Sequence, residues 1–151
     1  HPDVQAFAID SKKSVDMCRN FAGRVPLLVH AGDPRYDFSN PEQLFRFMEA
    51  LPEMTVIAAH FGGWDNWQKA IEILPGTPNL YVDTSSSFYA IQPDFACKMI
   101  EAYGPDHVLF GSDYPMWPVS GELNYLDKLG LDEKEKRMIL WENGARLLEL
   151  R

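Results

Sequence analysis

The chain has 151 residues, of which 46% are hydrophobic and 13% aromatic, and its formal net charge is -8. This length and composition fit one globular domain with a hydrophobic core. The acidic balance and the lack of any basic cluster argue against binding to nucleic acid or to an anionic membrane surface, and no apolar run approaches the roughly 20 residues of a membrane span.

The sequence begins with His1 rather than Met, so the natural N-terminus is expected to lie upstream, and the absence of a signal peptide decides nothing. The two cysteines, Cys18 and Cys97, lie far apart in helix-like contexts. They are expected to be reduced, buried thiols rather than a disulfide, which favours a cytoplasmic location.

The first predicted cycle of structure ends on a histidine. Residues 14–21 carry an approximate helical stripe, and the apolar residues 26–29 predict a buried strand that ends on His30. A turn-rich loop follows this strand. Asn40, with Pro41 at the first helical position, then predicts the start of a helix.

Three further cycles follow the same plan. Buried strands are predicted at residues 54–59, 79–82 and 108–110. Helices are predicted to begin near Trp64, Pro93 and Asp132.

Buried strands that alternate with amphipathic helices predict an α/β domain with a parallel sheet. Two architectures fit this pattern, an open doubly wound sheet and part of a (β/α)8 barrel. No glycine-rich phosphate-binding fingerprint follows any predicted strand, which weakens the case for a nucleotide-binding open sheet.

A polar side chain suited to an active site follows every predicted strand. Because the carboxyl ends of parallel strands share one edge, four such residues should converge there: His30, His60, Asp83 and Asp113. Histidine and aspartate bind Zn(II) and related divalent ions, and can also move a proton beside the ion. Each residue alone has a structural explanation, such as capping a turn, but their repetition favours a functional one.

Residues in the loops at this edge are candidate substrate contacts. Arg35 lies just beyond His30 and would either attract an anionic substrate or remain solvated. Tyr114, Trp117 and Phe88 would either line a pocket or pack on neighbouring loops.

Four ordered motifs resemble the later strands of the amidohydrolase superfamily. They occupy residues 28–32 (LVHAG), 56–63 (VIAAHFGG), 81–85 (YVDTS) and 110–115 (FGSDYP), and residues 139–148 resemble the family's closing helix. The most similar branch is amidohydrolase-2, which includes metal-dependent hydrolases and non-oxidative decarboxylases. The resemblance covers essentially the whole chain.

The resemblance implies a distorted TIM barrel with a divalent metal, with Zn expected and Mn or Fe as alternatives. His30 would be a metal ligand from the fifth strand. His60, on the sixth strand, would orient or deprotonate the water on the metal, or serve as a ligand in two-metal members. Asp113, on the eighth strand, would bind the metal and shuttle the proton, whereas the resemblance implies no fixed role for Asp83.

The sequence departs from the family in one large respect, because it contains no His-x-His pair of the kind that the family's first strand supplies. The dipeptide at residues 1–2 resembles the end of the fourth strand. Residues 1–151 are therefore expected to form a single partial domain, the second half of a barrel that needs about 250 residues. The missing half would come from a preceding segment or from a second copy of the chain.

These observations predict a metal-dependent hydrolase in which activated water attacks a carbonyl-type carbon of a small molecule. A decarboxylase that uses the same metal site is the first alternative. The second is a catalytically inactive fragment that acts only as a structural module, because an incomplete ligand set binds metal weakly.

Overall fold

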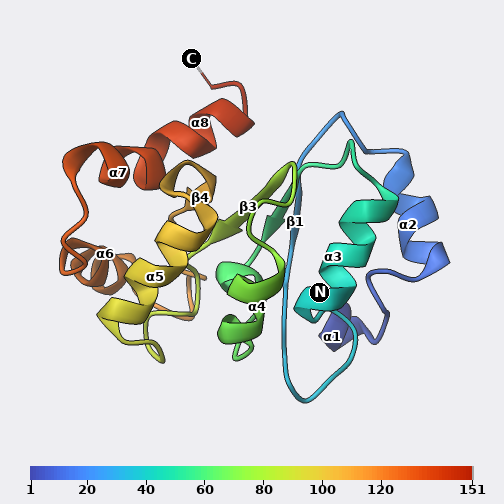
Figure 1. Cartoon of the computed structure of the whole chain (residues 1–151), viewed down its shortest axis with the longest axis horizontal. Coiled ribbons are helices and arrows are strands. Elements are labelled where there is room, and N and C mark those ends of the chain that lie inside the picture. The colour runs from blue at the N-terminus through green and yellow to red at the C-terminus, as the bar shows by residue number, and fades with distance from the viewer. Residues whose placement is uncertain (151) are drawn as a thin grey trace.

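Four short parallel strands form the centre of the computed structural model, which describes residues 1–150 (Figure 1). They are β1 (Leu27–Val29), β2 (Val56–Ala58), β3 (Leu80–Asp83) and β4 (Val108–Leu109). Each strand pairs in parallel with the next, in the order β1-β2-β3-β4. The predicted α/β class and the four parallel strands are confirmed, and each strand lies at its predicted place.

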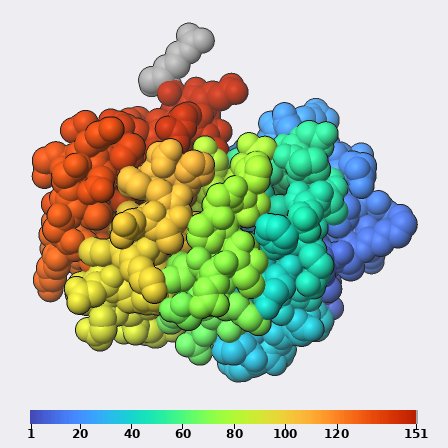
Figure 2. Space-filling model, viewed as in Figure 1, coloured from blue at the N-terminus to red at the C-terminus, as the bar shows by residue number. Residues whose placement is uncertain are grey.

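Three helices connect consecutive strands. They are α3 (Pro41–Ala50), α4 (Trp67–Ile73) and α5 (Pro93–Tyr103). Figure 1 shows them side by side across one face of the sheet, and Figure 2 shows the same segments as adjacent bands on the surface. This is the layer of helices that a series of β-α units places on the outside of a barrel.

The remaining elements lie at the two ends of the chain and around the strands. Before β1 come α1 (Pro2–Gln5) and α2 (Lys12–Arg19), and after β4 come α6 (Val119–Asp127), α7 (Glu133–Arg137) and α8 (Asn143–Leu147). Short irregular turns complete the list: the 3-10 turns η1 (His60–Gly62) and η2 (Pro105–His107), and the π turn η3 (Met138–Glu142). No helix within residues 1–150 is long and apolar enough to cross a membrane.

The two faces of the sheet differ in burial. Residues that alternate along the strands point to opposite faces, and the row formed by Val29, Ala58 and Val82 is buried against the helix layer. In the neighbouring row, Leu28 is 63% exposed and pairs in register with the half-buried Ile57. This second face borders an open cavity, as the inner face of an incomplete barrel would.

Local sequence explains where the connecting helices begin. The Asn40 side chain accepts a hydrogen bond from the Gln43 backbone, and the Gln43 side chain accepts one from Asn40, so α3 opens with the predicted cap and Pro41 at its start. The prediction for the next helix was wrong by one turn. Trp64 lies outside α4, which begins at Trp67.

The closing helix is interrupted by the π turn. Arg137 therefore pairs with Glu142, five residues away, with 3.2 Å between Nε and Oε1. A π turn makes residues five apart neighbours, whereas a continuous α-helix brings together residues four apart. The segment still packs against the sheet, because Asn143 is fully buried and its Nδ2 donates to the carbonyls of Pro105 and Val108 at 2.8 and 2.7 Å.

We expect Asn143→Ala to lower the free energy of unfolding by about 2 kcal/mol, because the buried carbonyls of Pro105 and Val108 would lose their shared donor. Urea denaturation measures this change. Asn124→Ala, at an exposed position of α6, is the matched control and should cost less than about 0.5 kcal/mol. Equal losses in the two variants would contradict the anchoring role of Asn143.

Candidate functional site

A cavity of about 1010 Å³ occupies the open face of the sheet and the carboxyl ends of the strands. All four strand-end residues line it: His30, His60, Asp83 and Asp113. The convergence expected from the parallel topology is therefore present in the structure. The roles that the sequence analysis assigns to these residues stay predictions.

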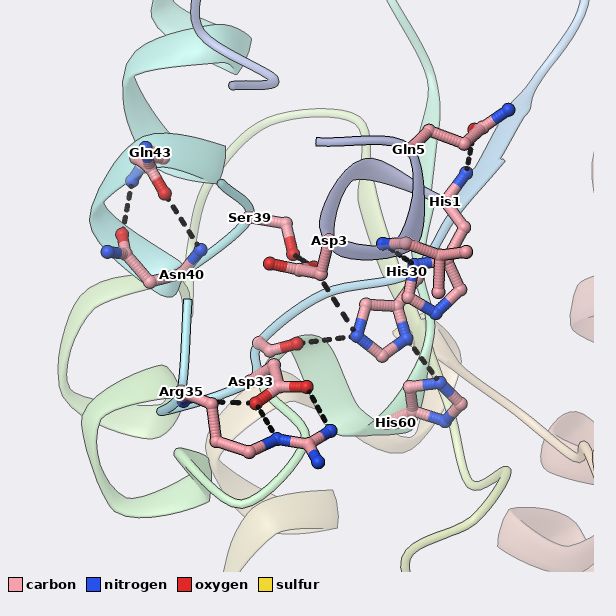
Figure 3. Close-up of polar contacts among 12 residues, drawn as sticks. His1, Asp3, Gln5, His30, Asp33, Arg35, Ser39, Asn40, Gln43 and His60 are labelled. Atoms are coloured by element: carbon pink, nitrogen blue, oxygen red, sulfur yellow. Dashed lines mark hydrogen bonds and ion pairs between the residues drawn. The ribbon is translucent and has the colours of Figure 1, made fainter. Parts of the chain in front are cut away.

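His30 follows β1, and both of its ring nitrogens have polar neighbours (Figure 3). Its Nδ1 lies 3.0 Å from Nε2 of His60, and its Nε2 lies 2.5 Å from the carbonyl oxygen of Gly32. Burial, reinforced by the neighbouring His60, lowers the pKa of His30 to about 4. The ring is therefore neutral near pH 7, which is the form that binds a metal.

His60 follows β2 and is held in a left-handed backbone conformation, with φ 61°. Only 7% of the residue is exposed. Its ring Nδ1 lies 2.9 Å from the Ser85 carbonyl and 3.0 Å from the Ser85 hydroxyl, and its backbone N–H donates to Asp83 at 3.1 Å. Asp83 thus acts as a cap of the turn after β3, one of the two uses expected for it.

When both rings are neutral, the paired imidazoles lack one proton for all of their contacts. The Ser85 carbonyl, the Gly32 carbonyl and the nitrogen pair between the rings each require one N–H, which makes three. Two neutral imidazoles carry only two protons. A cation on Nε2 of His30 would replace the third proton, so the donor set fits a metal at this nitrogen.

Two residues at the start of the chain also reach the site. The His1 ring stacks on His30 with 3.8 Å between ring centroids, and Oδ2 of Asp3 lies 3.5 Å from Nε2 of His30. Asp3 is 6% exposed, accepts a hydrogen bond from Ser39 through Oδ2, and leaves Oδ1 without a partner among the described residues. One ligand atom from each of three residues lies within 4.8 Å of the others: His1, Asp3 and His30.

Sequence reasoning missed Asp3 and did not place His1. The available signal was the family-like end of a fourth strand at residues 1–2, which continues the series of polar strand ends. A buried carboxylate needs a positive or hydrogen-bonding neighbour, and Oδ2 of Asp3 lies 3.5 Å from Nε2 of His30, so Asp3 is a second indication that this corner of the cavity accepts a cation.

Asp113 follows β4, lines the same cavity, and is exposed. Its Oδ2 accepts a hydrogen bond of 2.7 Å from the Ser86 hydroxyl, which in turn accepts one of 2.9 Å from Nε1 of Trp117. The carboxylate lies outside the group formed by His1, Asp3 and His30. The structure therefore brings Asp113 and His30 to one cavity without joining them in one ligand cluster.

Arg35 lines the cavity as predicted, but its charge is already paired. Its Nε and Nη2 donate to Asp33 at 2.9 and 2.7 Å, and its guanidinium lies 5.6 Å from the Trp64 ring centroid. Arg35 in turn lowers the pKa of the buried Asp33 carboxyl. The sequence analysis missed this partner, which fixes the orientation of the guanidinium at the rim.

The backbone at Gly32 explains how the two histidine loops meet. Its φ is 83°, and a Cβ at this position would lie 2.4 Å from the Trp64 nitrogen. The Trp64 N–H donates to the Ala31 carbonyl at 2.7 Å, so the two backbones touch directly. Only glycine accepts both this conformation and this contact.

The three aromatic candidates from the loops lie in three different environments. Trp117 lines the cavity, and its ring stacks on Tyr89 with 4.8 Å between centroids. Tyr114 is 77% exposed and lies outside the cavity lining, because the chain turns at Asp113 with φ 58°. Phe88 is buried in the core, where it stacks on Tyr125 at 4.4 Å. Of the two candidate substrate contacts, Trp117 therefore borders the cavity and Tyr114 does not.

We expect the metal-free protein to lose about 2–3 kcal/mol of stability through His30 as the pH falls from about 6.5 to 4. In this window the unfolded chain protonates His30, whereas burial keeps the folded ring neutral until about pH 4. The unfolded state thus binds more protons, so the contribution is complete above pH 6.5 and is lost on acidification. Urea unfolding at pH 7 and pH 4.5 measures it.

The comparison with His30→Gln isolates this contribution. Burial raises the pKa of Asp3, which acts in the opposite direction in both proteins. The variant should therefore show a smaller loss on acidification than the wild type. The same loss in both would mean that His30 is not a buried neutral group.

A model of the family described as amidohydrolase matches residues 15–150. A search of curated proteins gives no match. Among solved structures, an uncharacterised TIM-barrel protein from Bordetella bronchiseptica is 24% identical, with a TM-score of 0.80 over 95% of this chain and 53% of that chain.

Two further structures share the fold at lower identity. A 2-pyrone-4,6-dicarboxylic acid hydrolase from Pseudomonas putida, described as putative, is 15% identical, with a TM-score of 0.71 over 95% of this chain and 59% of that one. A dihydroxybenzoic acid decarboxylase from Polaromonas, with bound manganese and 2-nitroresorcinol, is 16% identical, with a TM-score of 0.70 over 95% and 55%. The chain thus spans about half the length of these structures and corresponds to half of a barrel.

Proposed function

The chain belongs to the amidohydrolase family, and on this premise we propose that it carries part of the active site of a metal-dependent hydrolase. The observation that carries the proposal is the convergence of His30, His60 and Asp113 on one cavity. The substrate would be a small molecule with a carbonyl-type carbon.

We propose that His30 binds a divalent cation through Nε2, with carboxylate oxygen from Asp3 or Asp113 beside it. The missing proton at the imidazole pair and the buried Asp3 carboxylate, whose Oδ2 lies 3.5 Å from Nε2 of His30, support this assignment. Zn(II) suits such a donor set, and Mn or Fe suits it as well. When bound, the cation supplies Lewis acidity toward a substrate oxygen and makes water more acidic.

The protein side chains would manage the proton and the substrate. His60 offers a ring nitrogen at the centre of the site, and Asp113 offers an exposed carboxylate held by Ser86. Asp113 can accept a proton from water and return it to the product, and His60 would do the same through Nε2 once that nitrogen is released from His30. Arg35, fixed by Asp33, and the Trp117 ring would contact an anionic, planar substrate at the rim.

Decarboxylation at the same site is the second candidate function, because structures of both reaction types share this fold. The two reactions differ in their products. The complete protein, loaded with Zn(II) or Mn(II), is incubated with carboxylated aromatic and pyrone acids in water enriched in oxygen-18. Label in the organic product supports hydrolysis, release of CO2 with no label in the organic product supports decarboxylation, and neither outcome across the panel contradicts both.

We also propose that the open face of the sheet is covered in the complete protein by the other half of the barrel. The exposed Leu28 and the half-length match to the barrel structures support this. A preceding segment of the same protein or a second copy of the chain would supply it. A monomeric 151-residue chain that melts cooperatively on its own would count against this proposal.

The alternative of an inactive structural module makes a different prediction about metal. Isothermal titration with Zn(II) on the 151-residue chain compares the two, because submicromolar binding requires a nearly complete set of ligands. Such binding would argue against the module, whereas weak binding here and tight binding in the complete protein would place the missing ligands in the other half.

A further inference from the structure

Asp83 and Ser85, in the turn after β3, make contacts that a simple turn cap would not need. We infer that they are positioning residues that hold the ring proton of His60 on Nδ1, so that Nε2 faces His30 without a proton. This deepens the proposed function and rests on it only for the catalytic use of Nε2. The placement of the proton itself follows from the hydrogen bonds.

Asp83 determines which groups donate and which accept in the hydrogen bonds that join it to Ser85 and His60. One carboxylate oxygen, Oδ1, accepts hydrogen bonds from the backbone N–H of His60 at 3.1 Å and of Ser85 at 2.9 Å, and a third from the Ser85 hydroxyl. An ionised carboxylate only accepts hydrogen bonds. The single hydroxyl proton of Ser85 is therefore directed to Asp83.

Because the Ser85 hydroxyl donates to Asp83, the position of the ring proton of His60 is also determined. The Ser85 hydroxyl oxygen, 3.0 Å from Nδ1 of His60, has no second proton to donate and must accept. The Ser85 carbonyl, 2.9 Å from the same nitrogen, can only accept. Two acceptors face Nδ1, so it carries the proton, and a neutral ring then has none on Nε2.

The ring has little freedom to escape this arrangement. His60 is buried, and its carbonyl accepts a hydrogen bond of 3.0 Å from Nε1 of Trp67. The next carbonyl, that of Phe61, accepts one of 2.9 Å from the Tyr103 hydroxyl. Helices α4 and α5 thus fix the backbone that follows the ring, and the turn after β3 selects its tautomer.

The unprotonated nitrogen of the His60 ring faces His30. Nε2 of His60 is 3.0 Å from Nδ1 of His30 and accepts a hydrogen bond from it. His30 then uses Nδ1 as a donor, so its Nε2, 2.5 Å from the Gly32 carbonyl and 3.5 Å from Asp3, is the position that needs a cation in place of a proton. Asp83 and Ser85 therefore orient both histidines, although neither needs to touch a substrate.

Nitrogen-15 NMR of the complete protein, labelled at its histidine rings, tests the inference without a substrate. His60→Gln assigns the signals by their loss. In the wild type, both metal-free and loaded with Zn(II), we expect a protonated Nδ1 and an unprotonated or metal-bound Nε2. A wild-type ring protonated at Nε2 and bare at Nδ1 would overturn the inference, whether or not the protein proves to be a hydrolase.

Ser85→Ala tests the part played by the hydroxyl. The ratio of the Nδ1–H form to the Nε2–H form should fall about two- to tenfold, because one acceptor of two is removed. Ser86→Ala, one residue along the same turn, removes a hydroxyl that contacts Asp113 and Trp117 instead. It should leave the His60 signals unchanged, and an unchanged ratio in Ser85→Ala would show that Ser85 does not select the tautomer.

Discussion

Replacement of His30 by alanine should remove the divalent metal from the complete protein. Its Nε2 is the nitrogen whose proton is missing in the imidazole pair, and it lies 3.5 Å from the buried Asp3 carboxylate. Loss of residues that only support a ligand typically weakens metal affinity by about 10- to 100-fold. Loss of the ligand itself should therefore weaken it by more than about 100-fold. Elemental analysis after dialysis measures the metal retained per chain.

His107→Ala is the matched control for this experiment. His107 ends η2, at the opposite end of β4 from Asp113, and its ring lies tilted by 30° against Tyr81 with 5.0 Å between ring centroids. It should retain the wild-type metal content. Full metal content in His30→Ala, in a protein that remains folded by circular dichroism, would refute the ligand assignment.

Asp113→Asn should lower kcat by about 100- to 10,000-fold on any substrate found in the product assay, because loss of a general acid or base typically has this effect. The amide keeps the size of the side chain and an oxygen that can accept the hydrogen bond from Ser86. The turn after β4 should therefore stay intact, and only the proton-transfer capacity is removed.

Metal content and a control variant separate the two roles predicted for Asp113. A normal metal content with low kcat would assign it to proton transfer alone, in keeping with its place outside the cluster of His1, Asp3 and His30. Loss of both metal and kcat in Asp113→Asn would make Asp113 a metal ligand as well. Asp106→Asn, at the opposite end of β4, should behave as the wild type. Undiminished turnover in Asp113→Asn would exclude both roles.

The strands and their polar ends were predictable because their signals are local. Short apolar runs such as residues 108–110, followed by glycine or a turn residue, fix both the strand and the position of the next polar side chain. Parallel pairing then brings those side chains to one edge with no further information. This is why His30, His60, Asp83 and Asp113 line one cavity.

The remaining parts of the site depend on contacts between distant segments. Asp3 reaches His30 only because the first turn of the chain packs on the loop that contains Ser39, 36 residues later. The orientation of Arg35 depends on the burial of Asp33, and the exposure of Tyr114 depends on the backbone turn at Asp113. None of these has a periodic pattern in the sequence.

The contact at Gly32 also bears on how the proposed active site could be re-engineered. Any side chain there would push apart the loops that carry the two histidines, since the nearest obstacle is backbone and cannot rotate away. Libraries aimed at a new substrate should therefore keep position 32 constant and vary the rim at Arg35, Trp64 and Trp117, whose side chains border the cavity. Diversity placed there can reshape specificity while the spacing of the imidazoles is preserved.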